Sequence, residues 1–258
     1  MQVAIITGAG SGIGFATAVK LADMGMAILG VGRDEAKLAH LAGAIKDADR
    51  LATLSVDVTA DDAPKRIVEL AVSRWGRIDF LINNAGTGRP KPLHETDDET
   101  LDFFLNLMLR APFRLARDVL PHMKPGSAII NVSSTFAVVG GMRGGAYSAA
   151  KAGLTGLTSH IACQYGASGI RCNAVAPGVV PTPMTEGRMQ DEKFRRINIE
   201  TTPFNRMGSV DDIASTIAFL CSTGGSFING QVIVVDGGWS STKYLSDYAL
   251  TSTWSPAR

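Results

Sequence analysis

Tyr147 and Lys151 are four residues apart, and the residues between them, 148–150, are small and compatible with a helix. Residues with this spacing share a helix face, so the phenol and the ammonium are expected to point the same way. A cation beside a phenol favours the phenolate and lowers its pKa from about 10. The pair therefore predicts a general acid/base that works nearer neutrality. Taken alone, it also fits a tyrosine and a lysine on the protein surface.

Two further polar residues have the types and positions expected of catalytic groups. Ser134 follows a predicted strand, 128–133, and precedes Tyr147 by thirteen residues. Ligands bind at the carboxyl ends of parallel strands, where a hydroxyl can polarise a substrate carbonyl. Asn106 interrupts an apolar run, 103–109, and a buried amide must find hydrogen-bond partners. A satisfied core asparagine is the alternative for Asn106.

A glycine-rich turn joins the first predicted strand to the first predicted helix. Its glycines have the spacing GxxxGxG at Gly8, Gly12 and Gly14, with Gly10, Ser11 and Ile13 between them. Glycines let the backbone approach a pyrophosphate, and the N-terminus of the following helix favours its negative charge. The turn therefore predicts a dinucleotide site, although such glycines can also be required by the turn itself.

The end of the second predicted strand bears on the choice of cofactor. A carboxylate at this point holds the ribose hydroxyls of NAD, whereas an arginine accommodates the 2′-phosphate of NADP. Gly32 occupies the carboxylate position, and Arg33 follows it. We therefore expect NADP(H) to be favoured over NAD(H). The alternative is a solvated Arg33 whose charge is neutralised by Asp34.

The elements that must position these residues alternate along the chain. Short apolar runs predict strands at 3–7, 27–31, 51–56, 79–83, 128–133, 170–175 and 232–235. Longer segments predict helices at 12–24, 34–45, 63–75, 96–123, 145–165 and 210–220. Helical crossovers between strands are typical of a parallel sheet covered on both faces. We expect one α/β domain of Rossmann type, with a doubly wound, mostly parallel, seven-stranded sheet.

Composition excludes several classes of function. The chain has 258 residues, of which 45% are hydrophobic, and its 25 basic and 24 acidic residues leave a net charge of +1. This balance favours neither nucleic acid nor an anionic membrane as a partner. No apolar stretch is long enough to span a bilayer, and no signal peptide is recognisable. Three scattered cysteines and four histidines show no metal-ligand spacing, so we expect a cytoplasmic protein without a metal site.

Residues 3–239 resemble the short-chain dehydrogenase/reductase family. Its landmarks occur in the expected order: the TGxxxGxG turn at 7–14, Asp57, the Asn-Asn-Ala-Gly segment at 83–86, Asn106, Ser134, Tyr147 with Lys151, Pro177-Gly178, Thr182, and Asp-Gly-Gly at 236–238. The resemblance implies that Tyr147 exchanges a proton with the substrate oxygen and that Ser134 orients the carbonyl. It also implies that Lys151 holds the nicotinamide ribose and that Asn106 anchors a water of a proton relay.

The resemblance also assigns residues to the cofactor. Asp57 and Val58 would hold the adenine, Asn84, Ala85 and Gly86 would line the ribose, and Val180 and Thr182 would clamp the carboxamide. The full expected set is Gly8, Gly10, Ser11, Gly12, Ile13, Gly14, Arg33, Asp57, Val58, Asn84, Ala85, Gly86, Tyr147, Lys151, Pro177, Gly178, Val180 and Thr182.

The expected substrate is a mid-sized, mostly apolar ketone or secondary alcohol, because the segment after Ser134, 135–142, is largely apolar. Residues 179–207 are expected to close over it as a lid. A 3-oxoacyl-(acyl-carrier-protein) reductase is the alternative, but such an enzyme needs a basic patch, and the neighbouring segments offer only Lys124. A dinucleotide-sensing protein without turnover is a more distant alternative.

The last nineteen residues, 240–258, extend beyond the family's usual length and include Tyr244, Tyr248 and Trp254. We expect this extension to follow a single Rossmann domain, 1–239, and to pack at a subunit interface rather than fray. The family resemblance implies a homotetramer or homodimer, with residues 103–115 and 154–165 as the expected dimer faces.

Overall fold

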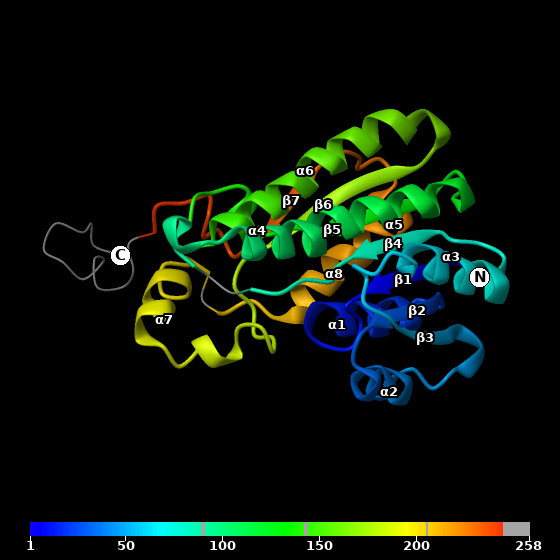
Figure 1. Ribbon diagram of the computed structural model, residues 1–258, viewed down its shortest axis with the longest axis horizontal. Helices are drawn as coiled ribbons and strands as arrows, with labels where there is room; N and C mark the ends of the chain where they lie inside the picture. Colours follow the sequence, from blue (N-terminus) through cyan, green and yellow to red (C-terminus); the bar gives the residue numbers. More distant parts are fainter. Residues whose placement is uncertain (89–90, 142–143, 205, 245–258) are drawn as a thin grey trace, which may run out of the picture.

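The fold is described from a computed structural model, in which residues 1–88, 91–141, 144–204 and 206–244 are placed well enough to describe. Seven strands form one sheet in the order β3-β2-β1-β4-β5-β6-β7, and each neighbouring pair is parallel (Figure 1). The strands are β1 (Val3–Thr7), β2 (Ala27–Gly32), β3 (Leu51–Ser55), β4 (Phe80–Asn83), β5 (Ala128–Val132), β6 (Arg171–Pro177) and β7 (Val232–Val235). The predicted Rossmann-type sheet is confirmed.

Helices cover both faces of the sheet. They are α1 (Gly12–Asp23), α2 (Glu35–Ala44), α3 (Ala63–Trp75), α4 (Asp98–Leu105), α5 (Ala111–Val119), α6 (Gly145–Tyr165), α7 (Glu192–Asn198) and α8 (Val210–Leu220). One apolar core joins α1, α2 and α8 to the sheet, and a second joins α3, α5 and α6 to the opposite face. The central strands are buried on both faces, which explains why β1 reads as an unbroken apolar run.

The helix expected over residues 96–123 is wrong in one respect, because it is not continuous. α4 ends at Leu105, a π-helical turn spans Asn106–Arg110, and α5 begins at Ala111. Pro112 has no N–H to donate and its ring would crowd the carbonyl four residues earlier. The wider turn accommodates the proline, and such turns are frequent at functional sites. The turn begins at Asn106, one of the predicted catalytic residues.

The strand order reverses between β1 and β4. Hydrogen bonds join the end of β1 to the residues that follow β4. The Asn84 side-chain amide donates to the Thr7 carbonyl at 2.9 Å, while the Thr7 hydroxyl accepts from the backbone N–H groups of Asn84 and Ala85, each at 3.0 Å. Ligands of doubly wound sheets bind at such a reversal. The glycine turn is therefore fixed against the segment that follows β4.

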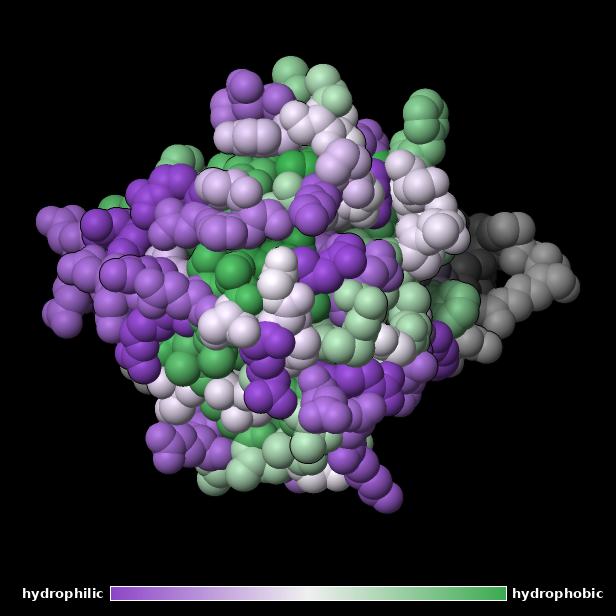
Figure 2. Space-filling view, turned by 90° about the vertical axis from the view of Figure 1, so that its right-hand side faces the viewer, coloured by the Kyte–Doolittle hydropathy of each residue, from purple (hydrophilic) through white to green (hydrophobic). Residues whose placement is uncertain are grey.

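The two ends of the molecule differ. The N-terminus and the start of β1 lie at the right of Figure 1, and α7 lies beyond the carboxyl ends of the strands at the left. Figure 2 shows the right-hand end, where hydrophilic side chains cover most of the surface and smaller hydrophobic areas lie between them. Within the described part of the chain, no helix is both long and apolar enough to cross a membrane.

Candidate active site

The glycine turn leaves no room for side chains. Gly8 and Gly12 have φ of +69° and +55°, in the left-handed region that favours glycine. A Cβ on Gly14 would lie 2.2 Å from the Gly8 carbonyl oxygen, which no substitution could accommodate without moving the backbone. The spacing seen in the sequence therefore has a steric cause at each of the three positions.

The N-terminus of α1 fits an anionic group. Its N-cap, Ser11, makes no side-chain capping bond, and the first turn contains no acidic residue. Ser11, Gly12 and Ile13 line a cavity of about 500 Å³. Free N–H groups and the helix dipole favour a phosphate in such a place. The residues present therefore fit the pyrophosphate of a dinucleotide.

Tyr147 and Ser134 line the same cavity, Tyr147 from α6 and Ser134 from the residue position that follows β5 by two. Burial raises the pKa of the Tyr147 phenol above its ordinary value of 10, although the Ser134 hydroxyl and the charge of Arg188 act in the opposite direction. This direction is opposite to the one expected from the sequence. The reason is that desolvation penalises the phenolate more than these neighbours stabilise it.

Lys151 is almost completely buried, with 4% of its surface exposed. Its Nζ donates to the Val132 carbonyl oxygen at 2.6 Å and lies 5.9 Å from the centre of the Tyr147 ring. Burial lowers the pKa of the ammonium to about 8. The expected placement of the two side chains together is borne out, but the ammonium faces the tyrosine ring and a backbone oxygen.

Asn106 has a buried side-chain oxygen, Oδ1, without a hydrogen-bond partner among the described residues. The residue opens the π-helical turn, which presents its side chain differently from an unbroken α-helix. A buried polar atom of this kind normally has a protein or water partner. Its chemistry fits the water-anchoring role that the family resemblance implied, although Asn106 does not line the cavity itself.

The far end of the cavity carries two cations. Arg33 and Lys37 both line it, and Arg33 Nη1 lies 3.5 Å from Asp57 Oδ2. Partial burial acts to raise the pKa of Asp57, but hydrogen bonds from Thr59 and the charge of Arg33 hold that pKa below its ordinary value. Asp57 is therefore an ionised residue that orients Arg33. Lys37 was not among the predicted residues, because its spacing after Arg33 carries no motif.

The structure brings most of the predicted residues together. Those that line the cavity are Gly8, Ser11, Gly12, Ile13, Arg33, Asn84, Ala85, Gly86, Ser134, Tyr147, Lys151, Pro177, Gly178, Val180 and Thr182. Gly10, Gly14, Asp57, Val58 and Asn106 do not line it. Residues that sequence reasoning missed include Met108, Met184, Arg188, Phe194 and Asn198. All but Met108 belong to the expected lid, 179–207, where no periodic pattern showed which side chains face inward.

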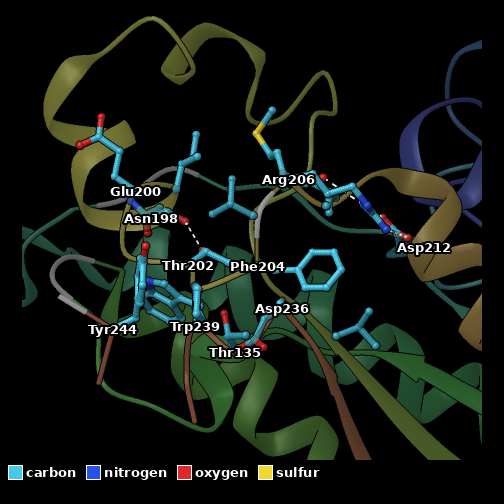
Figure 3. A pocket seen from close by; sticks show the side chains of 18 of the residues that line it. Thr135, Asn198, Glu200, Thr202, Phe204, Arg206, Asp212, Asp236, Trp239 and Tyr244 are labelled. Atoms are coloured by element: carbon cyan, nitrogen blue, oxygen red, sulfur yellow. Dashed lines mark hydrogen bonds and ion pairs between the residues drawn. The ribbon is translucent and has the colours of Figure 1, made fainter. Parts of the chain in front are cut away.

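A second cavity of about 1050 Å³ adjoins the first, and the two share Thr135, Phe136, Val179, Val180 and Asn198. Figure 3 shows Trp239 and Tyr244, from the segment after β7, close to Asn198 and Glu200 of the lid. The Trp239 indole N–H donates to the Ile197 carbonyl at 3.1 Å and to the Thr201 hydroxyl at 3.0 Å. Trp239, the last residue before the extension, therefore ties the segment after β7 to the lid. Met142, at the end of the expected pocket wall, and Tyr248 and Trp254 of the extension lie outside the described residues.

Comparison with known proteins agrees with the geometry. A family model described as enoyl-(acyl carrier protein) reductase matches residues 8–240. A cis-4-hydroxycyclohexanecarboxylate dehydrogenase from Sinomonas cyclohexanicum is 38% identical over 93% of this chain and 97% of its own. The chain belongs to the short-chain dehydrogenase/reductase family. As a member of this family it is an oxidoreductase of alcohols and ketones.

Two solved members of the short-chain dehydrogenase/reductase family share the whole fold. L-Sorbose reductase from Gluconobacter frateurii, solved with NADPH and L-sorbose, is 32% identical, with a TM-score of 0.87 over 93% of this chain and 97% of its own. A 3-ketoacyl-(acyl-carrier-protein) reductase from Brucella melitensis, solved with NADH, is 33% identical, with a TM-score of 0.84 over 93% of this chain and 98% of its own.

Among the described residues no cluster of His, Cys, Asp and Glu could hold a metal ion.

The burial of Lys151 leads to a prediction about the free energy of unfolding. Its pKa of about 8 lies below the ordinary 10.5, so the charged lysine costs the folded state about 3 kcal/mol at pH 7. This cost is fully present below pH 8 and fades as the pH rises towards 10.5. We expect Lys151→Met to raise the free energy of unfolding at pH 7 by about 2 kcal/mol, because the lost bond to Val132 offsets about 1 kcal/mol.

Urea unfolding at pH 7 and at pH 10.5 measures this effect, and the gain is expected to disappear at the higher pH. Exposed Lys46 has no ion pair to a described residue, so Lys46→Met is the control and should change the free energy of unfolding little at either pH. A Lys151→Met protein less stable than the wild type at pH 7 would contradict this account of the buried charge.

Proposed function

We propose that the protein interconverts a mid-sized, mostly apolar ketone and its secondary alcohol with NADP(H), and that Tyr147 is the general acid/base. The observation that carries this proposal is one cavity lined by Ser134, by Tyr147 and by the N-terminal end of α1. Lys151, directly behind the tyrosine, completes the group. Proton transfer and anion binding are thus available within a single site.

In the direction of reduction, the Ser134 hydroxyl donates a hydrogen bond to the substrate carbonyl and orients it. Tyr147 gives its phenolic proton to the same oxygen as the carbon is reduced, and in oxidation it takes that proton back. A raised pKa keeps Tyr147 protonated at neutral pH, which suits reduction. When bound, the nicotinamide supplies or accepts the hydride. Lys151, which lines the same cavity, would hold the nicotinamide ribose.

The basic end of the cavity supports a preference for NADP(H). Arg33 and Lys37 lie where a 2′-phosphate would be bound, and Gly32 offers no carboxylate to repel it. Both cations already have an acidic neighbour, Asp57 and Asp34, at 3.5 Å, so the phosphate must compete with weak, exposed ion pairs. The relatives include one solved with NADPH and one solved with NADH, so the preference of this chain rests on its own residues.

The apolar lining favours a small hydrophobic substrate. The same cavity that Ser134 and Tyr147 line is also lined by Met108, Phe136, Val179, Met184 and Phe194. The dehydrogenase from Sinomonas cyclohexanicum is named for a hydroxyl on a cyclohexane ring. We therefore take simple ring ketones as first substrates.

The alternative, a 3-oxoacyl-(acyl-carrier-protein) reductase, has the support of one solved relative, the 3-ketoacyl-(acyl-carrier-protein) reductase from Brucella melitensis. Such an enzyme should reduce acetoacetyl thioesters faster than simple ketones. We expect this protein to reduce simple ketones faster than acetoacetyl thioesters.

We also propose that the protein is a cytoplasmic homotetramer or homodimer and that the extension, 240–258, packs at an interface between subunits. The exposed rings of Phe103 and Phe113, 45% and 51% accessible, support an interface at residues 103–115. Such rings on a surface are typical of contact regions between proteins.

Tyr147→Phe tests the catalytic proposal. Without the phenolic proton, we expect reduction of cyclohexanone with NADPH to fall by about 10²- to 10⁴-fold, while the dissociation constant of NADPH stays within about threefold. Tyr165→Phe, at the end of α6 and outside the cavity, is the matched control and should keep full activity. Undiminished turnover by Tyr147→Phe would contradict the proton-transfer role. A wild type that binds NADPH but reduces no ketone or thioester would favour the dinucleotide-sensing alternative.

Arg33→Ala tests the cofactor preference. For the wild type we expect the dissociation constant of NADPH to be at least tenfold lower than that of NADH, a difference of about 1.4 kcal/mol. Arg33→Ala should abolish most of this difference, because it should weaken the binding of NADPH and leave the binding of NADH unchanged. Nicotinamide fluorescence at one fixed ionic strength measures both constants, and Arg66→Ala, which removes an exposed arginine paired with Asp62, is the control. Equal affinities in the wild type would mean that Arg33 does not hold a phosphate.

A further inference from the structure

The active-site cavity has an uneven set of charges. Arg33, Lys37, Lys151 and Arg188 line it, and no Asp or Glu is among its described lining residues. The proposed function accounts for three of these cations, because Arg33 and Lys37 lie at the adenosine end and Lys151 lies behind Tyr147. Arg188 is left without a role in it.

Arg188 belongs to the lid and is held over the cavity. It ends the short turn Glu186–Arg188, and its Nη2 donates to the Gly88 carbonyl oxygen at 3.1 Å, across 100 residues of sequence. Met184 packs against the same glycine, because a Cβ on Gly88 would lie 3.3 Å from the Met184 sulfur. The bond to Gly88 therefore holds the guanidinium against another lining residue of the cavity.

Among the described residues, two other arginines of the lid, unlike Arg188 and the exposed Arg195, pair with acidic side chains. Arg196 pairs with Glu192 at 2.6 Å and Arg206 pairs with Asp212 at 2.7 Å, whereas Arg188 forms no ion pair with a described residue. The guanidinium has five N–H donors in a planar fork, and the bond to Gly88 occupies one of them. A half-buried cation with free donors, in a cavity with no acidic residue among its described lining, fits an anion of matching shape.

We propose that Arg188 binds a carboxylate of the substrate, so that the preferred substrates are oxo acids and hydroxy acids whose reacting carbon and carboxylate lie at opposite ends of a small apolar body. The inference rests on the proposed function and names its substrate class. Ser134 and Tyr147 bind the reacting oxygen, the apolar lining holds the body, and Arg188 holds the carboxylate.

The position of Arg188 relative to the catalytic group agrees with this assignment. Arg188 and Tyr147 line the same cavity, and the charge of Arg188 acts to lower the pKa of the Tyr147 phenol. The pyrophosphate site lies elsewhere, at Gly8, Ser11 and Gly12 of the glycine turn. A single guanidinium fork matches a carboxylate in both charge and geometry.

The first experiment compares an acid with its uncharged ester. The substrates are 4-oxocyclohexanecarboxylate and its methyl ester, reduced with NADPH by the wild type, Arg188→Met, Arg188→Lys and the control Arg195→Met, which removes an exposed arginine outside the cavity. We expect Arg188→Met to lower kcat/KM for the acid by about ten- to hundredfold, mainly through KM. The ester should change less than about threefold, and Arg188→Lys should lie between the wild type and Arg188→Met.

Equal losses for acid and ester would overturn the proposal, because they would show that Arg188 only closes the lid through Gly88. A weakened dissociation constant for NADPH in Arg188→Met would also overturn it, because the arginine would then serve the cofactor. The proposal would also be overturned if the wild type had a higher kcat/KM for the methyl ester than for the acid.

The second experiment does not depend on turnover. Cyclohexanecarboxylate carries the anion and the ring but no reacting oxygen, and its binding to the protein–NADPH complex can be followed by nicotinamide fluorescence. We expect Arg188→Met to bind it at least tenfold more weakly than the wild type and Arg195→Met to bind it equally well. Binding with no ketone reduction would preserve the carboxylate site and refute the proposed function, whereas ketone reduction with no carboxylate binding would refute the carboxylate site alone.

Discussion

The buried ammonium of Lys151 is the constraint on which the site depends. A cation removed from water costs free energy unless its surroundings compensate it, and here one described carbonyl oxygen, that of Val132, accepts from it at 2.6 Å. Val132 ends β5 and Lys151 lies one turn along α6 from Tyr147, so this contact fixes the helix relative to the strand. The hydroxyl of Ser133 strengthens the same joint by donating to the Lys151 carbonyl at 3.1 Å. The placement of the phenol follows from this joint.

The parallel sheet supplies the other half of the arrangement. Because all seven strands point the same way, the turn after β1, the segment after β4 and Ser134 after β5 meet at one edge. The reversal of strand order between β1 and β4 opens that edge for a dinucleotide, and Thr7 and Asn84 hold the two sides together. The N-terminus of α1 and the Tyr147–Lys151 pair therefore line one cavity.

Sequence reasoning reached the sheet and most of the cavity, because strand patterns, steric glycines and the Tyr147–Lys151 spacing are local features. It failed where the answer depends on long-range contacts. The π-helical turn at Asn106 arises from Pro112, which a periodicity argument passes over. The raised pKa of Tyr147 comes from burial that no neighbouring residue reveals. Arg188 reaches the cavity only through Gly88, a hundred residues away in the chain.

The most direct test of the account is the titration of Lys151 itself. NMR spectra of protein labelled with ¹³C at the lysine Cε atoms, with Lys151→Met used to assign the signal, give the pKa of this one ammonium. The account predicts a value of about 8, set by burial against Val132 and the Tyr147 ring. A value near the ordinary 10.5 would show that the ammonium is solvated and would contradict the central claim that a buried cation organises the site.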